Sequence, residues 1–127
     1  METIEISSAG AHAGGIVLEL FTLYVGCADA KAAKGIVSQV VGSFFESFTL
    51  LEGEGFFRGM REPVQLVRIA TDDVEKVLAA ASEIRARLNQ DGVGVEYGGA
   101  YYRCTAEDCA EALRRRFAER RRERENP

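Results

Sequence analysis

Residues 47–70, SFTLLEGEGFFRGMREPVQLVRIA, contain two apolar, strand-like stretches joined by a glycine-rich middle. Along an extended chain, Phe48 lies on the same face as three charged residues further on, namely Glu52, Glu54 and Arg58. Charged side chains do not follow an apolar face into a core, so the first strand must leave its sheet near Glu52. The segment therefore predicts a long hairpin that reaches beyond its own domain.

The glycines of this hairpin do not form a phosphate-binding loop. Such a loop leads from a strand into a helix, whose N-terminal amides face the anion. Here Pro63 and the β-branched residues behind it exclude an immediate helix. Two interpretations remain open: the tip of the hairpin packs on a neighbouring subunit, or a ligand binds at the base of the hairpin, where it leaves the sheet. The candidate ligand-binding residues are Glu52, Glu54, Arg58, Arg61 and Glu62, with Gln90 as an outlier.

The residues on either side of the hairpin predict one strand and two helices. Residues 16–26 form a strand that is apolar on both faces, as expected of a strand covered on both sides. Asp29 can cap a helix over residues 30–45, where apolar residues recur at helical spacing. Asp72, with Glu75 three residues later, is typical of a capping pair for a second helix that starts at Asp73 and ends near Asn89.

The last part of the chain predicts one more strand and a third helix. Residues 93–97 form the strand, which Gly98 and Gly99 break or bulge before residues 100–104 continue it. Thr105 and Asp108 are then expected to cap a C-terminal helix with a short apolar stripe.

This order of elements is βαββαβ followed by a helix, which predicts an α+β, ferredoxin-like domain with an antiparallel sheet. The expected division is a flexible N-terminal arm (1–15), the ferredoxin-like domain (16–104), and a C-terminal helix with an Arg-rich tail (105–127). Such a sheet carries helices on one face only, so something else has to cover the second apolar face. We expect another subunit, because the last helix has too few apolar residues to do so.

Composition limits the classes of function. A chain of 127 residues is one domain by size, and its net charge of −4 argues against non-specific nucleic-acid binding by the whole surface. No apolar run reaches the roughly 18 residues of a membrane span, and the N-terminus lacks the basic region of a signal peptide. Cys27, Cys104 and Cys109 are odd in number and lack paired spacing, so we predict neither a disulfide framework nor a zinc site. A reducing, cytoplasmic setting is the expectation.

Other chemistry-bearing residues have simpler explanations. His12 lies in an Ala/Gly segment and is expected to be an exposed residue without a catalytic role. Asp72, Asp73 and Glu75 are better explained by helix capping than by a cation site. No nucleophile–base pair and no metal-ligand spacing stands out, so catalytic and metal residues are assigned as none and the cofactor as unknown.

Seven arginines against two glutamates in residues 114–124 predict a solvated helix end. An acidic partner or nucleic acid at this tail is the alternative.

The topology and the glycine-rich connection between strands two and three resemble the PII-like signalling proteins and the CutA-like proteins. Residues 47–84 carry the resemblance, and with the flanking elements it covers about residues 16–97. It is a likeness of pattern and topology. It implies a homotrimer, with the second and third strands extended into a hairpin or flexible loop.

Three functions follow as hypotheses. The preferred one is a homo-oligomeric, most simply trimeric, module that binds a small molecule or regulates a partner from subunit clefts, although a dimer would bury the second sheet face equally well. The alternative is a structural or adaptor protein whose hairpin mediates assembly and whose Arg-rich tail docks an acidic partner or nucleic acid. An enzyme working in the same clefts is the third.

Overall fold

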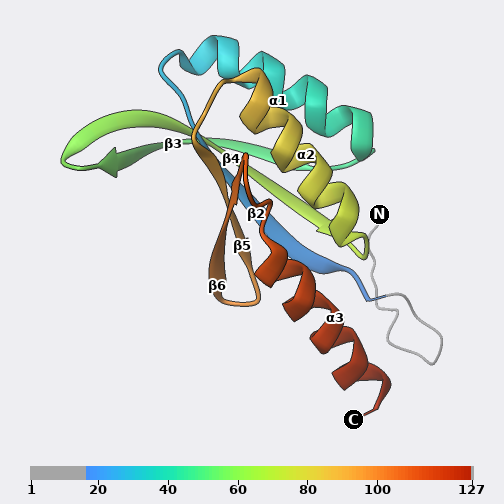
Figure 1. The fold of residues 1–127 in the computed structure, drawn as a ribbon. Coiled ribbons are helices and arrows are strands. Elements are labelled where there is room, and N and C mark those ends of the chain that lie inside the picture. The colour runs from blue at the N-terminus through green and yellow to red at the C-terminus, as the bar shows by residue number, and fades with distance from the viewer. Residues whose placement is uncertain (1–16, 127) are drawn as a thin grey trace.

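The computed structural model of the protein describes residues 17–126, which form a five-stranded antiparallel sheet and three helices (Figure 1). The elements in chain order are β2 (Glu19–Gly26), α1 (Ala30–Phe44), β3 (Thr49–Phe57), β4 (Met60–Thr71), α2 (Val74–Arg87), β5 (Gly92–Tyr97), β6 (Ala100–Thr105) and α3 (Glu111–Glu125). The order across the sheet is β3-β4-β2-β5-β6. The predicted α+β, ferredoxin-like class is confirmed, with β6 as an extra edge strand. The predicted N-terminal arm and His12 lie outside the described residues.

Helices α1 and α2 lie side by side on one face of the sheet (Figure 1). The apolar stripe of α1 includes Val37 and Val41, which pack with Phe21 and Leu23 of β2 in a core from which water is excluded. Burial of a side chain of this size contributes about 1.5–3 kcal/mol. The helical layer thus covers the face of β2 that carries its odd-numbered residues.

The helix caps follow from local hydrogen bonding. The Asp29 side chain accepts hydrogen bonds from the backbone N–H groups of Lys31 and Ala32, as predicted. The second helix is capped one residue later than predicted. Asp73 accepts from the Lys76 N–H, while the Asp73 N–H donates to the Thr71 hydroxyl. That second bond places Asp73 rather than Asp72 at the cap.

Residues 100–105 do not continue the preceding strand. The chain reverses at Gly98 and Gly99, whose φ angles of +59° and +81° suit glycine, and β6 pairs antiparallel with β5 from Tyr97↔Ala100 to Gly92↔Thr105. Two consecutive glycines are thus the turn of a hairpin here, where a break or bulge was expected. The hairpin widens the sheet beyond the four strands predicted.

Helix α3 begins at Glu111, later than the predicted capping pair suggests. Thr105 and Asp108 instead form the turn before it, since the Asp108 N–H donates to the Thr105 hydroxyl, and Asp108 Oδ1 accepts from the Glu111 N–H. The helix then packs Phe117 against the rings of Phe21 and Tyr97, at centroid distances of 6.0 and 5.8 Å. Since both rings point toward the helical layer, α3 extends that layer and leaves the opposite face of the sheet uncovered.

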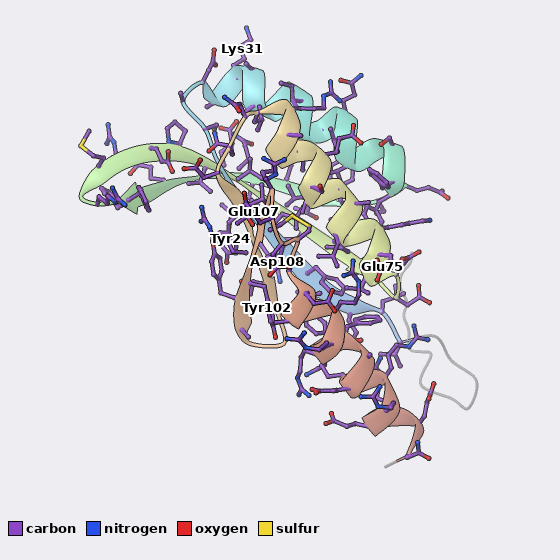
Figure 2. All side chains as sticks on the ribbon, in the orientation of Figure 1. Tyr24, Lys31, Glu75, Tyr102, Glu107 and Asp108 are labelled. Carbon is purple, nitrogen blue, oxygen red and sulfur yellow. A yellow bond between two sulfur atoms is a disulfide. The ribbon has the colours of Figure 1, made fainter. Side chains whose placement is uncertain are left out.

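A disulfide joins Cys104, at the end of β6, to Cys109, just before α3. Figure 2 shows Glu107 and Asp108 in the short loop that it closes. The prediction that the cysteines lack a pairing is therefore wrong for these two. The cause is local: the turn at Thr105 and Asp108 folds the chain back, so that Cys104 and Cys109 face each other as an isolated bridge. Cys27 is a free, buried thiol.

The β3–β4 hairpin projects past the rest of the sheet, as predicted (Figure 1). Pairing of β4 with β2 stops at Gly26↔Val64, whereas β3 and β4 remain paired as far as Phe57↔Met60. The turn between them is made by Arg58 and Gly59, both with positive φ. The outer part of the hairpin is therefore a two-stranded ribbon without a helix on it.

Candidate functional site

The sheet has one face that the helices do not cover, which we call the open face. It is formed by alternate residues of each strand, because side chains alternate along a strand. Leu20 of β2 is 47% exposed there and Leu51 of β3 is 49% exposed. The open face also carries Thr22, Tyr24, Leu66, Arg68, Glu96 and Tyr101, as the register shows.

A groove of about 420 Å³ lies where the projecting hairpin leaves the sheet, and we call it the root groove. Its walls come from the hairpin, from β2 and from the β5–β6 hairpin. The polar side chains along it are those of Tyr24, Glu62, Gln90, Asp91, Tyr101 and Arg103. The groove therefore combines two carboxylates, one guanidinium and two phenol rings over a small surface.

Glycines form the floor of the root groove. A β-carbon on Gly26 would lie 2.5 Å from Glu62 Oε1, one on Gly55 would lie 2.6 Å from Val64 Cγ2, and one on Gly92 would lie 2.8 Å from Arg103 Nε. A β-carbon on Gly94 would overlap the ring of Tyr101. The side chains of neighbouring strands thus lie flat across bare backbone. Glycines in strands commonly mark a place where a ligand or another chain comes close.

The structure brings two of the six predicted ligand-binding residues together: Glu62 and Gln90 both line the root groove. The other four lie outside it on the hairpin. Glu54 pairs with Arg61 at 3.3 Å and Glu52 lies 3.9 Å from Lys34, while Arg58 stacks over the Phe57 ring. All these pairs are well exposed, so each contributes little to stability.

The sequence held a signal for the groove residues that the prediction missed. In GVGVEY (Gly92–Tyr97) the even positions are Gly92, Gly94 and Glu96, so one face of β5 is almost bare. Because β6 pairs with β5, the large side chains of Tyr101 and Arg103 fill the space that these glycines leave. Recognising residues 100–105 as a separate strand would have placed them on the open face.

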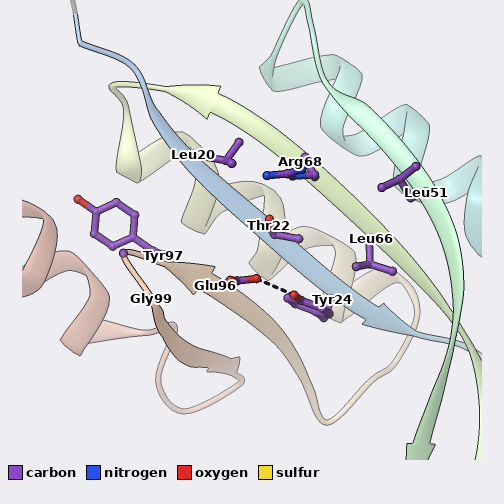
Figure 3. A pocket seen from close by; sticks show the side chains of 10 residues that line it. Leu20, Thr22, Tyr24, Leu51, Leu66, Arg68, Glu96, Tyr97 and Gly99 are labelled. Carbon is purple, nitrogen blue, oxygen red and sulfur yellow. Dashed lines mark hydrogen bonds between the residues drawn. The ribbon is translucent and has the colours of Figure 1, made fainter.

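Two opposite charges lie on the open face, on either side of β2 (Figure 3). Thr22 is paired with Arg68 of β4 on one side and with Glu96 of β5 on the other. The Tyr24 hydroxyl donates a 2.6 Å hydrogen bond to Glu96 Oε1. This bond, together with burial, raises the pKa of Tyr24 above its ordinary value, because only the neutral phenol can donate to the Glu96 carboxylate.

Glu19 is a buried carboxylate that the sequence did not single out. It accepts hydrogen bonds from the Tyr97 hydroxyl at 2.6 Å, from Arg120 Nε at 3.1 Å and from Arg124 Nη2 at 2.9 Å. Burial alone would raise the pKa of Glu19, but the hydrogen bonds from these three side chains outweigh it and lower the pKa. Two arginines of the predicted tail therefore anchor α3 to the first strand.

Much of the Arg-rich segment is engaged within the chain. Arg114 contacts Glu75 at 2.6 Å and Glu111 at 2.7 Å, and Arg116 pairs with Glu119 and Glu123. The segment is helical as far as Glu125. These contacts reduce the number of guanidinium groups that an acidic partner or nucleic acid would find unpaired.

Neither a metal-binding cluster nor a membrane-spanning helix is found in the described residues. Within residues 17–126, no group of three or more His, Cys, Asp or Glu side chains is arranged to hold a metal ion. Over the same residues, no helix has the length and apolar character needed to cross a bilayer.

The comparisons with known proteins show a fold and no family. No protein-family model and no curated protein matches the chain, so the resemblance to PII-like and CutA-like proteins remains one of topology. Among solved structures, a phage SAM lyase in its apo state matches with a TM-score of 0.54 and 17% sequence identity. The match covers 71% of this chain and 91% of the lyase chain. At this identity the likeness shows the α+β fold alone.

Proposed function

We propose that the chain forms a homo-oligomer, with three subunits as the simplest arrangement, that binds a small molecule in the root groove as a sensing or regulatory module. The observation that carries the proposal is the glycine floor of Gly26, Gly55, Gly92 and Gly94. A floor of this kind lets a flat molecule approach the backbone closely once the overlying side chains swing away. The exposed apolar residues of the open face support the association of subunits.

The lining of the groove indicates the chemical class of the ligand. Tyr24 and Tyr101 offer ring faces and edges, with centroids 5.8 Å apart, to a flat heteroaromatic group. Glu62 and Asp91 suit a cationic group, and Arg103 suits a carboxylate or phosphate. We therefore expect a ligand that joins an aromatic ring to a zwitterionic or charged chain.

A SAM-binding protein, with or without lyase activity, is the second candidate function. Its support is the fold that the chain shares with the phage SAM lyase. SAM has an adenine ring, a sulfonium cation and an amino-acid carboxylate, and these groups match the rings, carboxylates and guanidinium of the root groove in kind. Consumption of SAM by the purified protein, followed by mass spectrometry, separates a lyase from a binding module.

The adaptor alternative has less support. Arg114, Arg116, Arg120 and Arg124 already pair with carboxylates of the same chain. Removing residues 114–127 would also remove the anchor at Glu19, so a truncation would confound partner loss with destabilisation.

The test of the small-molecule function is native mass spectrometry of protein purified without refolding, followed by thermal-shift titration with SAM and with ATP. For the probe that binds, Glu62→Gln and Gln90→Ala should each raise the dissociation constant by about tenfold or more. Both variants should leave the assembly intact. Glu54→Gln is the matched control, because it changes the same charge on the same hairpin outside the groove. Equal weakening by the control, or no bound mass and no shift at saturating probe, would contradict the proposal.

A further inference from the structure

The open face is apolar yet contains one cation and one anion near its centre (Figure 3). Arg68 and Glu96 are partnered across β2 with the same residue, Thr22. Residues opposite each other on antiparallel strands lie about 5 Å apart, so the α-carbons of Arg68 and Glu96 are separated by roughly 10 Å. The two charges therefore occupy opposite sides of the face at the same level along the strands.

The two charges do not satisfy each other within one chain. Glu96 is held by the Tyr24 hydroxyl, and among residues 17–126 no carboxylate forms an ion pair with Arg68. In water this costs little, because both groups are exposed. Once a partner covers the open face, each charge loses its hydration and needs an opposite charge beside it.

From this placement we infer that the partner is a second copy of this chain, and that Arg68 of one copy pairs with Glu96 of the next. The inference rests on the proposed homo-oligomer and adds the residues that select its partner and its register. A different protein would have to supply a carboxylate and a cation at matching positions. The open face of a second copy carries both charges, with the same separation.

Both simple symmetries bring these charges together. A two-fold axis that runs parallel to β2, above Thr22 and midway between two stacked open faces, exchanges the two sides of the face, so that Arg68 lies over the partner copy's glutamate and Glu96 over its arginine. In a closed ring of three, the β4 side of each copy meets the β5 side of the next. In each case the apolar contacts around Leu20 and Leu51 supply the affinity, and the charges fix which side meets which.

Charge exchange tests the pairing. Arg68→Glu leaves acids at both of these positions and Glu96→Arg leaves bases at both, so each single variant should self-associate at least tenfold more weakly than wild type in sedimentation equilibrium. The double variant Arg68→Glu/Glu96→Arg restores opposite charges and should recover most of the loss. Arg122→Glu, on the exposed side of α3, is the matched control and should associate like wild type. Circular dichroism checks that every variant is folded.

Mixing the two single variants identifies the symmetry. A two-fold pair should be restored in full as a one-to-one complex. A ring of three made from two kinds of chain always keeps one contact between like chains, so it should be restored only in part. Either result supports the pairing.

Single variants that associate like wild type, or a double variant as weak as the singles, would overturn the pairing while leaving the homo-oligomer intact. A wild-type chain that stays monomeric at every concentration tested would overturn the proposed assembly itself.

Discussion

Replacing Glu19 by glutamine would show how strongly one buried carboxylate holds α3 to the sheet. The side chain is 6% exposed and accepts hydrogen bonds from Tyr97, Arg120 and Arg124. A hydrogen bond to a charged group contributes about 1.5–3 kcal/mol, and glutamine keeps an acceptor oxygen but loses the charge. The two arginine side chains are each 35% exposed, so water compensates part of the loss. We expect a decrease of about 2 kcal/mol in the free energy of unfolding.

The assay is urea unfolding followed by circular dichroism, since the chain has no tryptophan. For a domain of this size, 2 kcal/mol corresponds to a Tm lowered by about 6–12 °C. Glu107→Gln is the control, because it removes an exposed carboxylate in the loop before α3, and it should change stability by less than about 0.5 kcal/mol. A Glu19→Gln variant as stable as this control would refute the reasoning.

Acidity provides an independent check on Glu19. Its pKa in the folded protein lies below the ordinary value of 4.5, so the carboxylate binds protons more readily in the unfolded chain. The stabilisation is therefore fully present above about pH 4.5 and is lost as the pH falls through the lowered folded-state pKa. The difference between wild type and Glu19→Gln should be constant from neutral pH down to this point and shrink below it. A difference in unfolding free energy between wild type and Glu19→Gln that grew as the pH fell would contradict a lowered folded-state pKa.

Three further predictions concern the loop before α3, the glycine floor and the hairpin tip. Reduction of the Cys104–Cys109 disulfide by a dithiol should lower the free energy of unfolding by about 2 kcal/mol, which is the loop-closure entropy expected for so short a loop. Equal urea midpoints with and without the reductant would contradict this. Gly94→Ala should displace the exposed Tyr101 ring and weaken ligand binding in the root groove, while shifting the Tm by only a few degrees. An unchanged NMR environment of Tyr101 would show that the ring does not need a glycine beneath it. Phe57→Ser with Met60→Ser should leave the stability of the single chain within about 0.5 kcal/mol, because these side chains are 59% and 72% exposed; a loss above 1 kcal/mol would mean that the tip packs within its own chain.

The parts of the fold that could be predicted are those set by local periodicity. The apolar repeat of α1 with its Asp29 cap, and the run of charges that leads β3 out of the sheet, each follow from a few neighbouring residues. The elements that were misplaced depend on contacts distant in sequence. Gly98 and Gly99 form a hairpin turn because β6 pairs with the edge of β5. The sequence of residues 93–104 alone does not distinguish this pairing from one interrupted strand.

The candidate site divides in the same way. Glu62 and Gln90 are polar residues that were proposed from the sequence as ligand-binding residues, and both line the root groove. The charged residues nearer the tip were grouped with them because they share a segment, yet the hairpin carries Glu54 and Arg61 beyond the groove, where they pair with each other. Glu19 escaped notice because its three donors come from Tyr97, Arg120 and Arg124, about 80 to 105 residues away along the chain.

The two outer strands of the sheet have a consequence for how the protein resists aggregation. An edge strand exposes unpaired N–H and C=O groups that invite pairing with the edge of another molecule. In β3 the segment EGEG alternates glycine with Glu52 and Glu54, and a row of like charges with weak strand formers is a poor template for such pairing. The other edge, β6, is only six residues long and ends at the disulfide. The chain can therefore expose an apolar face without growing edge to edge into fibres.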